Sequence, residues 1–276
     1  MIISTSSASL KIYRAYTQNL TKQSGALNNI SSGIKINSAK DDPIGIAQSE
    51  RFRMQIRGLQ MAGENTQDGV SMLQTAEGGL DGITSNLQRI RELLVEAGGV
   101  TTDSDKNDIQ TEINQNLKGI DDMTNNTEFN GVKLLAGGKP DTIPMVIGAN
   151  EGEKVDIPVF DLTTATTGLD LNTTTVDVNN TDDSLKIVDK ALSEITSARS
   201  KYGALENRFT STYNSTMELS EKLESADSGL RDADLAGEMI EYSKDNILIQ
   251  AGTAMMVQSN KLPQDALQIL SNIRSR

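Results

Sequence analysis

The clearest pattern in the sequence is a run of apolar residues, at alternating steps of three and four, between residues 73 and 94. Three unbroken heptads of this kind are typical of a helix face that packs as in a coiled coil. The positions are Leu73, Ala76, Leu80, Ile83, Leu87, Ile90 and Leu94. Gly78 and Gly79 lie inside the run, and each costs about 1 kcal/mol relative to alanine. Packing must offset that cost, or the helix breaks at these glycines.

A helix start precedes this run at Asp42-Pro43. An aspartate side chain can accept hydrogen bonds from the free amides of a first turn, and proline loses nothing at the first helical position. We therefore expect Asp42 and Pro43 to cap a helix that runs from Pro43 to about Gly98.

Helical patterns also occupy both ends of the chain. Residues 6–32 repeat Leu20 and Leu27 at a spacing of seven, a narrow stripe that indicates a seam between helices. Further helices are expected over residues 103–127, over residues 184–223, and from residue 232 onward. Pro263 is expected to end or kink the last of them, because proline removes a helix hydrogen bond.

The helical period is lost between residues 136 and 183, where Thr, Asn, Asp and Gly are frequent. The stretch IPMVIGANEGEKVDIPVF alternates around a glycine-containing turn and predicts a β-hairpin. Residues 163–183 are expected to form a surface loop. The predicted fold class is mainly α, with long coiled-coil-like helices from both chain ends and a small β-hairpin insert at about 136–183, in an elongated rod.

Composition supports thin helical elements and excludes several kinds of chemistry. Aromatic residues make up 3% of the 276 positions, which is few for a compact core. The absence of histidine and cysteine excludes Ser-His-Asp triads, HExxH metal sites and thiolate zinc sites. A net charge of −12 argues against a nucleic-acid partner. The sequence contains no run of 18 apolar residues, so no membrane span is predicted. We expect no enzyme activity, cofactor or metal.

Several long motifs resemble those of bacterial flagellins. In the first half they are SSGIKINSAKDDPIGIA, GENTQDGVSMLQTAEGGLDGI, LQRIRELLVEA and TEFNGVKLL; in the second half they are ALSEITSARSKYGALENRF, LRDADLAGEM and ILIQAGTAMMVQSNKLPQDAL. The resemblance covers about nine-tenths of the chain. It implies a structural subunit that self-assembles into the bacterial flagellar filament for motility, in a short form without outer variable domains.

The resemblance also implies a domain layout and partners. Residues 1–42 and 232–276 would form a terminal coiled coil lining the inner tube of the filament, and residues 43–231 an outer α-helical rod carrying the hairpin. The subunit would leave the cell unfolded through the flagellar export apparatus, without a cleaved signal peptide, and polymerise at the filament tip. Its partners would be further copies of itself, an export chaperone, and the filament cap and junction proteins.

Two groups of residues are expected to carry this function. The subunit packing seams are Leu20, Leu27, Leu73, Leu80, Ile83, Leu87, Ile90 and Leu94. By resemblance, Arg89, Leu93 and Glu112 match contacts of the animal flagellin-sensing Toll-like receptor, and the alternative is that they pack against the next subunit.

Two other functions fit part of the sequence. The hook–filament junction protein shares the terminal helices, whereas the hairpin and LQRIREL favour flagellin. A soluble coiled-coil adaptor would form a small closed oligomer and no filaments.

Overall fold

The structure is a computed structural model that describes residues 7–99, 102–137, 141–165, 168–172 and 175–274. It is mainly helical, as predicted. The helices are α1 (Ser7–Ser32), α2 (Pro43–Ala97), α3 (Asp103–Asn126), α4 (Thr181–Arg231) and α5 (Leu235–Arg274), with a short 3-10 helix, η1 (Val178–Asn180). The strands are β1 (Glu128–Phe129), β2 (Val132–Lys133), β3 (Thr142–Val146) and β4 (Lys154–Pro158).

The chain divides into two compact units. The terminal unit contains Met1–Arg53 and Leu223–Arg276, and the middle unit contains Met54–Lys222. Helices α2 and α4 therefore contribute residues to both units. No helix among the described ranges has the length and apolar character needed to cross a membrane.

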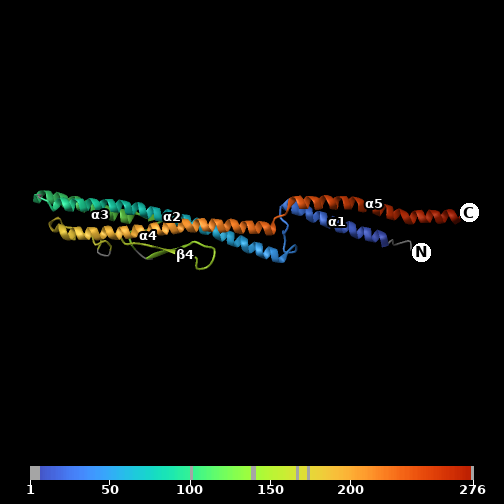
Figure 1. The fold of residues 1–276 in the computed structure, drawn as a ribbon, viewed down its shortest axis with the longest axis horizontal. Helices are drawn as coiled ribbons and strands as arrows, with labels where there is room; N and C mark the ends of the chain where they lie inside the picture. Colours follow the sequence, from blue (N-terminus) through green and yellow to red (C-terminus); the bar gives the residue numbers. More distant parts are fainter. Residues whose placement is uncertain (1–6, 100–101, 138–140, 166–167, 173–174, 275–276) are drawn as a thin grey trace. The chain divides into compact units, whose positions relative to one another are not determined.

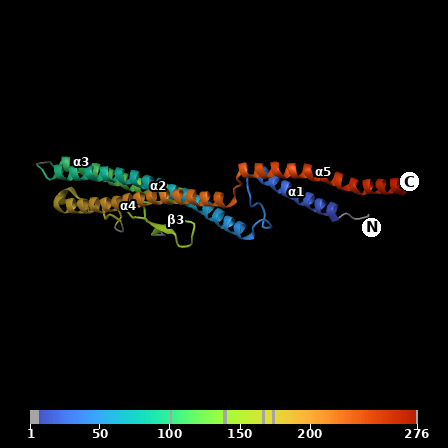
Figure 2. The ribbon, with the colours of Figure 1, turned by 45° about the vertical axis from the view of Figure 1, so that its right-hand side comes forward.

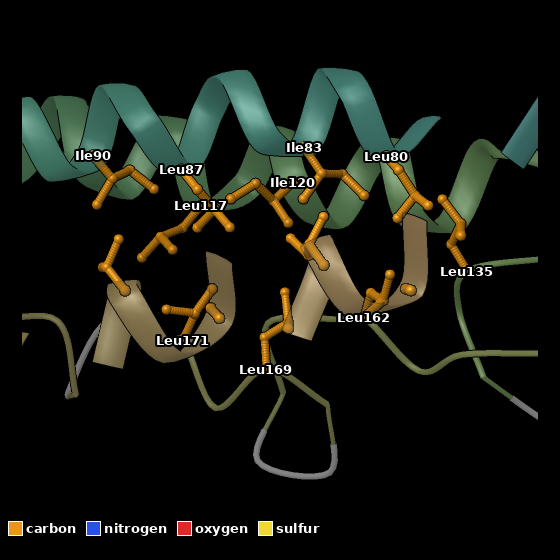
Figure 3. Packing of buried hydrophobic residues seen from close by; sticks show 14 of the residues in the cluster. Leu80, Ile83, Leu87, Ile90, Leu117, Ile120, Leu135, Leu162, Leu169 and Leu171 are labelled. Carbon is orange, nitrogen blue, oxygen red and sulfur yellow. The ribbon is translucent and has the colours of Figure 1, made fainter. Parts of the chain in front are cut away.

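In the middle unit, α2, α3 and α4 run side by side around one apolar core (Figures 1 and 2). Figure 3 shows the heptad residues of α2 meeting Leu117 and Ile120 of α3. Segments between the helices complete the core with side chains that include Leu135 and Leu162. The two-residue strands β1 and β2 pair just beyond the end of α3.

The hairpin was predicted in the right place. Strands β3 and β4 pair antiparallel, with Thr142 opposite Pro158 and Val146 opposite Lys154. The hairpin is attached to α4 by Tyr202, whose hydroxyl donates to the Pro158 carbonyl at 3.1 Å. Burial raises the pKa of Tyr202, so this hydroxyl keeps its proton.

Helix α2 continues through Gly78 and Gly79 without a break. The two glycines differ in surroundings. A Cβ on Gly79 would lie 2.6 Å from Thr127 Oγ1 and 2.9 Å from Leu135 Cδ1, whereas a Cβ on Gly78 would meet nothing within 4 Å. Gly79 is therefore a close-packing position, where the absence of a side chain lets the β1–β2 segment approach the helix.

Residues 163–183 are not simply a surface loop, and that prediction was wrong. Leu169, Leu171, Val176 and Val178 are buried in the core of the middle unit. Side chains of α3 bind the backbone of this segment. Gln110 donates to the Val176 carbonyl at 3.1 Å and accepts from the Val178 amide at 3.0 Å. Irregular backbone can cover a core when its polar groups find such partners.

The helix ends also differ from prediction. Helix α4 runs to Arg231 rather than to residue 223, and its residues 223–231 belong to the terminal unit. Helix α5 does not end at Pro263 but continues to Arg274. Proline removes one amide donor, and the helix tolerates the loss of that single hydrogen bond.

Candidate assembly surfaces

Helices α1 and α5 pack side by side in the terminal unit (Figures 1 and 2). Their pairing is antiparallel. The Ser9 and Ser259 hydroxyls lie 2.8 Å apart, and Asn29 Nδ2 donates to Glu238 Oε1 at 3.0 Å. A Cβ on Gly252 would lie 3.8 Å from the Tyr16 ring, at a level between these two contacts.

The seam of this helix pair follows a heptad pattern and is unusually polar. On α1 the buried and half-buried seam positions are Ser9, Ile12, Tyr16, Asn19, Gln23, Ala26 and Ile30. On α5 they are Glu238, Tyr242, Asp245, Ile249, Gly252, Met256 and Ser259, with Glu238 and the others again at steps of three and four. Seven of these fourteen positions hold Ser, Asn, Gln, Glu, Asp or Gly, and two more are tyrosines.

Larger apolar side chains lie outside the seam. On α1 the exposed set is Leu10, Tyr13, Leu20 and Leu27; on α5 it is Leu235, Met239, Ile240, Ile247, Leu248, Met255 and Val257. Leu20 and Leu27 were expected in a packing seam. They are 47% and 52% exposed, so the pairing with α5 does not use them. Exposed large apolar side chains in such number are typical of proteins that bind a partner.

The opposite holds for the seam residues of α2. Leu73, Leu80, Ile83, Leu87, Ile90 and Leu94 are each at most 2% exposed. They pack inside the core of the middle unit, where Figure 3 shows Leu80, Ile83, Leu87 and Ile90. The α2 heptads therefore hold one subunit together, and their side chains are not exposed for contact with another copy.

The start of α2 is built by two aspartates. Asp42 Oδ1 accepts from the Ile44 amide at 3.0 Å, and Pro43 is the first helical residue. Asp41 Oδ2 accepts from the Ser38 amide at 2.9 Å and from the Ser38 hydroxyl at 3.0 Å. These hydrogen bonds hold the pKa of Asp41 below its usual value. This role of Asp41, which accepts from amides three and four residues before it, was not predicted.

The turn between α1 and α2 also pairs with the segment between α4 and α5. Ile34 and Asp232 form an antiparallel bridge, and the Lys35 amide donates to the Arg231 carbonyl at 2.8 Å. Gly33 enters this bridge at a φ of 73°, a conformation that favours glycine. The bridge sets the level at which α1 and α5 begin their antiparallel pairing.

Arg89 and Glu112 meet on the surface of the middle unit, but Leu93 does not join them. Arg89 Nη2 lies 2.7 Å from Glu112 Oε1, and both side chains are about half exposed. The hydrogen bond and the charge of Glu112 raise the pKa of Arg89. Leu93 is 1% exposed and belongs to the core. The structure thus brings two of the three receptor-contact candidates together on a surface that joins α2 to α3.

Several ion pairs that were not predicted connect α2 to α4, two of them in the middle unit with short distances. Arg199 Nη2 lies 2.7 Å from Glu77 Oε1, and Arg91 Nε lies 2.9 Å from Asp189 Oδ1. Sequence spacing could not find them, because the paired residues are far apart in the chain.

The chain matches two family models. Residues 3–139 match the bacterial flagellin N-terminal helical region, and residues 185–270 match the bacterial flagellin C-terminal helical region. Among curated relatives, the chain is 39% identical to a flagellin of Halalkalibacterium halodurans and 39% identical to a flagellin of Bacillus subtilis. Each alignment covers 98% of this chain and 100% of the relative.

A solved structure supports the fold alone. A putative flagellar hook-associated protein from Vibrio parahaemolyticus is similar with a TM-score of 0.60 and 16% identity, over 70% of this chain and 100% of that one. Both family models and both full-length relatives are flagellins, and they favour flagellin over a hook-associated protein. The chain belongs to the bacterial flagellin family and is a structural, non-enzymatic subunit of the extracellular flagellar filament used for motility.

Proposed function

We propose that copies of this subunit assemble through the apolar outer faces of α1 and α5. Residues 1–42 and 232–276 line the inner tube of the filament in this proposal, and residues 43–231 form the outer rod. One observation carries it: in the terminal unit, half of the seam positions between the helices are polar residues or glycine, while many leucine, isoleucine, methionine and valine side chains are exposed outside the seam.

The energetics favour burial of these outer faces between copies. Removing one large aliphatic side chain from water contributes about 1.5–3 kcal/mol. Leu20, Leu27, Ile240, Ile247 and Val257 are all exposed on the single chain. A contact between different surfaces of identical subunits, repeated with a rotation that does not close, produces a helical filament.

The same faces suit the events before assembly that the flagellin resemblance implies. We propose that the subunit is exported unfolded and added at the filament tip, beneath the cap and beyond the junction proteins. An export chaperone that covers the outer face of α5 would prevent premature association. The absence of cysteine supports export in an unfolded state, because no disulfide can obstruct threading.

Cysteine labelling tests the proposed surface directly, since the chain has no cysteine of its own. Leu20→Cys and Ile247→Cys should each react readily with a maleimide in the monomer. Filaments are then grown from seeds and verified by negative-stain electron microscopy. In these filaments the labelling rate of both cysteines should fall by a factor of about ten or more, because packing against a neighbouring copy excludes the reagent.

Either of two results would count against this proposal. Equal labelling of monomer and filament at both positions would show that the outer faces stay open. Short closed oligomers in place of filaments would instead support the coiled-coil adaptor.

We also propose that Arg89 and Glu112 form a surface shared by neighbouring subunits and by the animal flagellin-sensing Toll-like receptor. The half-exposed ion pair between α2 and α3 supports this proposal. Leu93 contributes from below, by fixing the helix that carries Arg89.

Arg89→Asp should weaken both filament assembly and receptor signalling, because it places a carboxylate against Glu112 and reverses the surface charge. Losing the exposed pair itself should lower stability by only about 0.2–1 kcal/mol. Arg91→Asp is the matched control: it breaks the similarly exposed pair with Asp189. Seeded elongation and a receptor reporter assay measure both effects, and unchanged assembly by Arg89→Asp would refute the shared surface.

A further inference from the structure

The turn between β1 and β2 contains Asn130 followed by Gly131, the only asparagine-glycine pair in the sequence. Phe129 pairs with Val132, so these two residues form the loop of the hairpin. Both have positive φ angles, 50° for Asn130 and 77° for Gly131, and both are exposed. Positive φ at both central residues of a two-residue loop is typical of a type I′ turn.

An asparagine before glycine can lose ammonia without an enzyme, because glycine has no side chain to hinder a close approach. The backbone nitrogen of Gly131 attacks Asn130 Cγ, the Cγ–Nδ2 bond breaks, and the proton of the attacking amide leaves with the ammonia. Water then opens the resulting five-membered succinimide at either of its two carbonyls. One product is aspartate, and the other is isoaspartate, whose backbone runs through the former side chain.

The folded turn holds the reacting atoms apart. In the succinimide ring, the attacking nitrogen and Cβ lie on the same side of the Cα–C bond. Asn130 lies in the left-handed region, where ψ is about +30 to +60°. At such a ψ the nitrogen of Gly131 is nearly opposite to Cβ, so it cannot reach Cγ. Ring closure therefore requires a large rotation about ψ, which opens the turn.

Contacts of the segment around the turn keep it closed. The Leu134 amide donates to the Thr127 carbonyl at 3.2 Å, and the Leu162 amide donates to the Leu135 carbonyl at 2.9 Å. Leu134 and Leu135 are both buried in the core. Thr127 and Leu135 also occupy the space that a Cβ on Gly79 of α2 would need.

We propose that Asn130-Gly131 is a deamidation site that the folded β1–β2 turn keeps unreactive and that reacts when the turn opens. Isoaspartate adds one carbon to the backbone of a loop built for two residues. The strand register and the buried leucines that follow it are then displaced, so the modified chain does not regain its core packing. This inference concerns the single chain and does not depend on the assembly surfaces proposed above.

Peptide mapping by mass spectrometry measures the deamidation rate at Asn130 in native buffer and in concentrated urea at the same pH. A synthetic peptide of residues 125–135, with and without urea, corrects for the effect of the solvent. The folded chain should react more slowly by a factor of about ten or more, because the attack requires local opening. Equal corrected rates in the folded and the unfolded chain would overturn the proposal.

Two adjacent glycines of α2 give a matched pair of variants. A Cβ on Gly79 would lie 2.6 Å from Thr127 Oγ1 and push the β1–β2 segment away, whereas a Cβ on Gly78 would meet nothing within 4 Å. Gly79→Ala should therefore raise the deamidation rate at Asn130 about tenfold, through easier local opening. Gly78→Ala should leave it unchanged. Hydrogen exchange of α4 verifies that both variants are folded. Equal rates in two folded variants would contradict the protective role of the closed turn.

Asn130→Asp separates the new charge from the altered backbone. Aspartate tolerates the left-handed conformation, so this variant should fold with the Leu134 and Leu135 amides protected as in the unaltered chain. Chains that carry isoaspartate, refolded from urea, should show weak protection of the same two amides. Full protection in the isoaspartate form would refute the proposed effect on the core.

Discussion

Ile247→Asp should abolish seeded elongation under conditions in which the unaltered chain grows long filaments. Ile247 is 66% exposed on α5, on the side away from α1. Its replacement removes an apolar side chain from the proposed interface and introduces a charge there. Burial of a large aliphatic side chain contributes about 1.5–3 kcal/mol to the free energy of association, and burying an unpaired charge would weaken association further. We expect the critical concentration for elongation to rise about a hundredfold or more, at about 1.4 kcal/mol per factor of ten.

The controls distinguish loss of the interface from loss of the fold. Ile247→Leu keeps the apolar volume and should elongate nearly normally. Both variants should retain the helical circular dichroism of the starting protein and the hydrogen-exchange protection of α3. Normal filament growth by Ile247→Asp would show that the outer face of α5 remains in solvent after assembly.

Leu87→Ala should destabilise the middle unit by about 3 kcal/mol, within the range of about 2–5 kcal/mol for buried leucine. Leu87 is fully buried between α2 and its neighbours (Figure 3). Truncation leaves a cavity in a core built from three long helices. Filling it would require a whole helix to shift, so we expect the cavity to persist and the unit to lose stability. Urea unfolding, with hydrogen exchange of α3 as the local readout, measures the loss.

Val95→Ala is the comparison on the same helix. Val95 is 56% exposed, so its truncation should change the free energy of unfolding by less than about 0.5 kcal/mol. Equal effects of the two substitutions would mean that the α2 heptads do not hold the core of the subunit.

The contrast between α1 and α2 explains which parts of the assembly surfaces were predictable. The α2 heptads have a single apolar stripe, and a helix with one such stripe buries it. Helix α1 carries two stripes of the same period, one through Leu20 and Leu27 and one through Tyr16 and Gln23. Periodicity alone cannot say which of the two faces α5. In the structure the more polar stripe faces α5, and the leucines face outward.

Hydrogen bonds between residues far apart in the sequence could not be predicted from the sequence. The aspartate cap of α2 was predictable because all its atoms lie within one turn of chain. The two hydrogen bonds of Gln110 to the segment after residue 175 join parts of the chain that share no pattern. Asp245 is similar, since its burial depends on the register of two helices that are distant in sequence.

Patterns within the sequence were sufficient to predict the helices, the hairpin and the flagellin family, and the composition excluded histidine and cysteine chemistry. These follow from local periodicity, local capping and composition, which act over a few neighbouring residues. Tertiary packing places the α2 heptads inside the subunit and turns the leucines of α1 outward. It also lays Leu169, Leu171, Val176 and Val178 over the core and buries Asp245. Burial requires two surfaces that meet, and the second surface comes from a distant part of the chain, where local patterns carry no information about it.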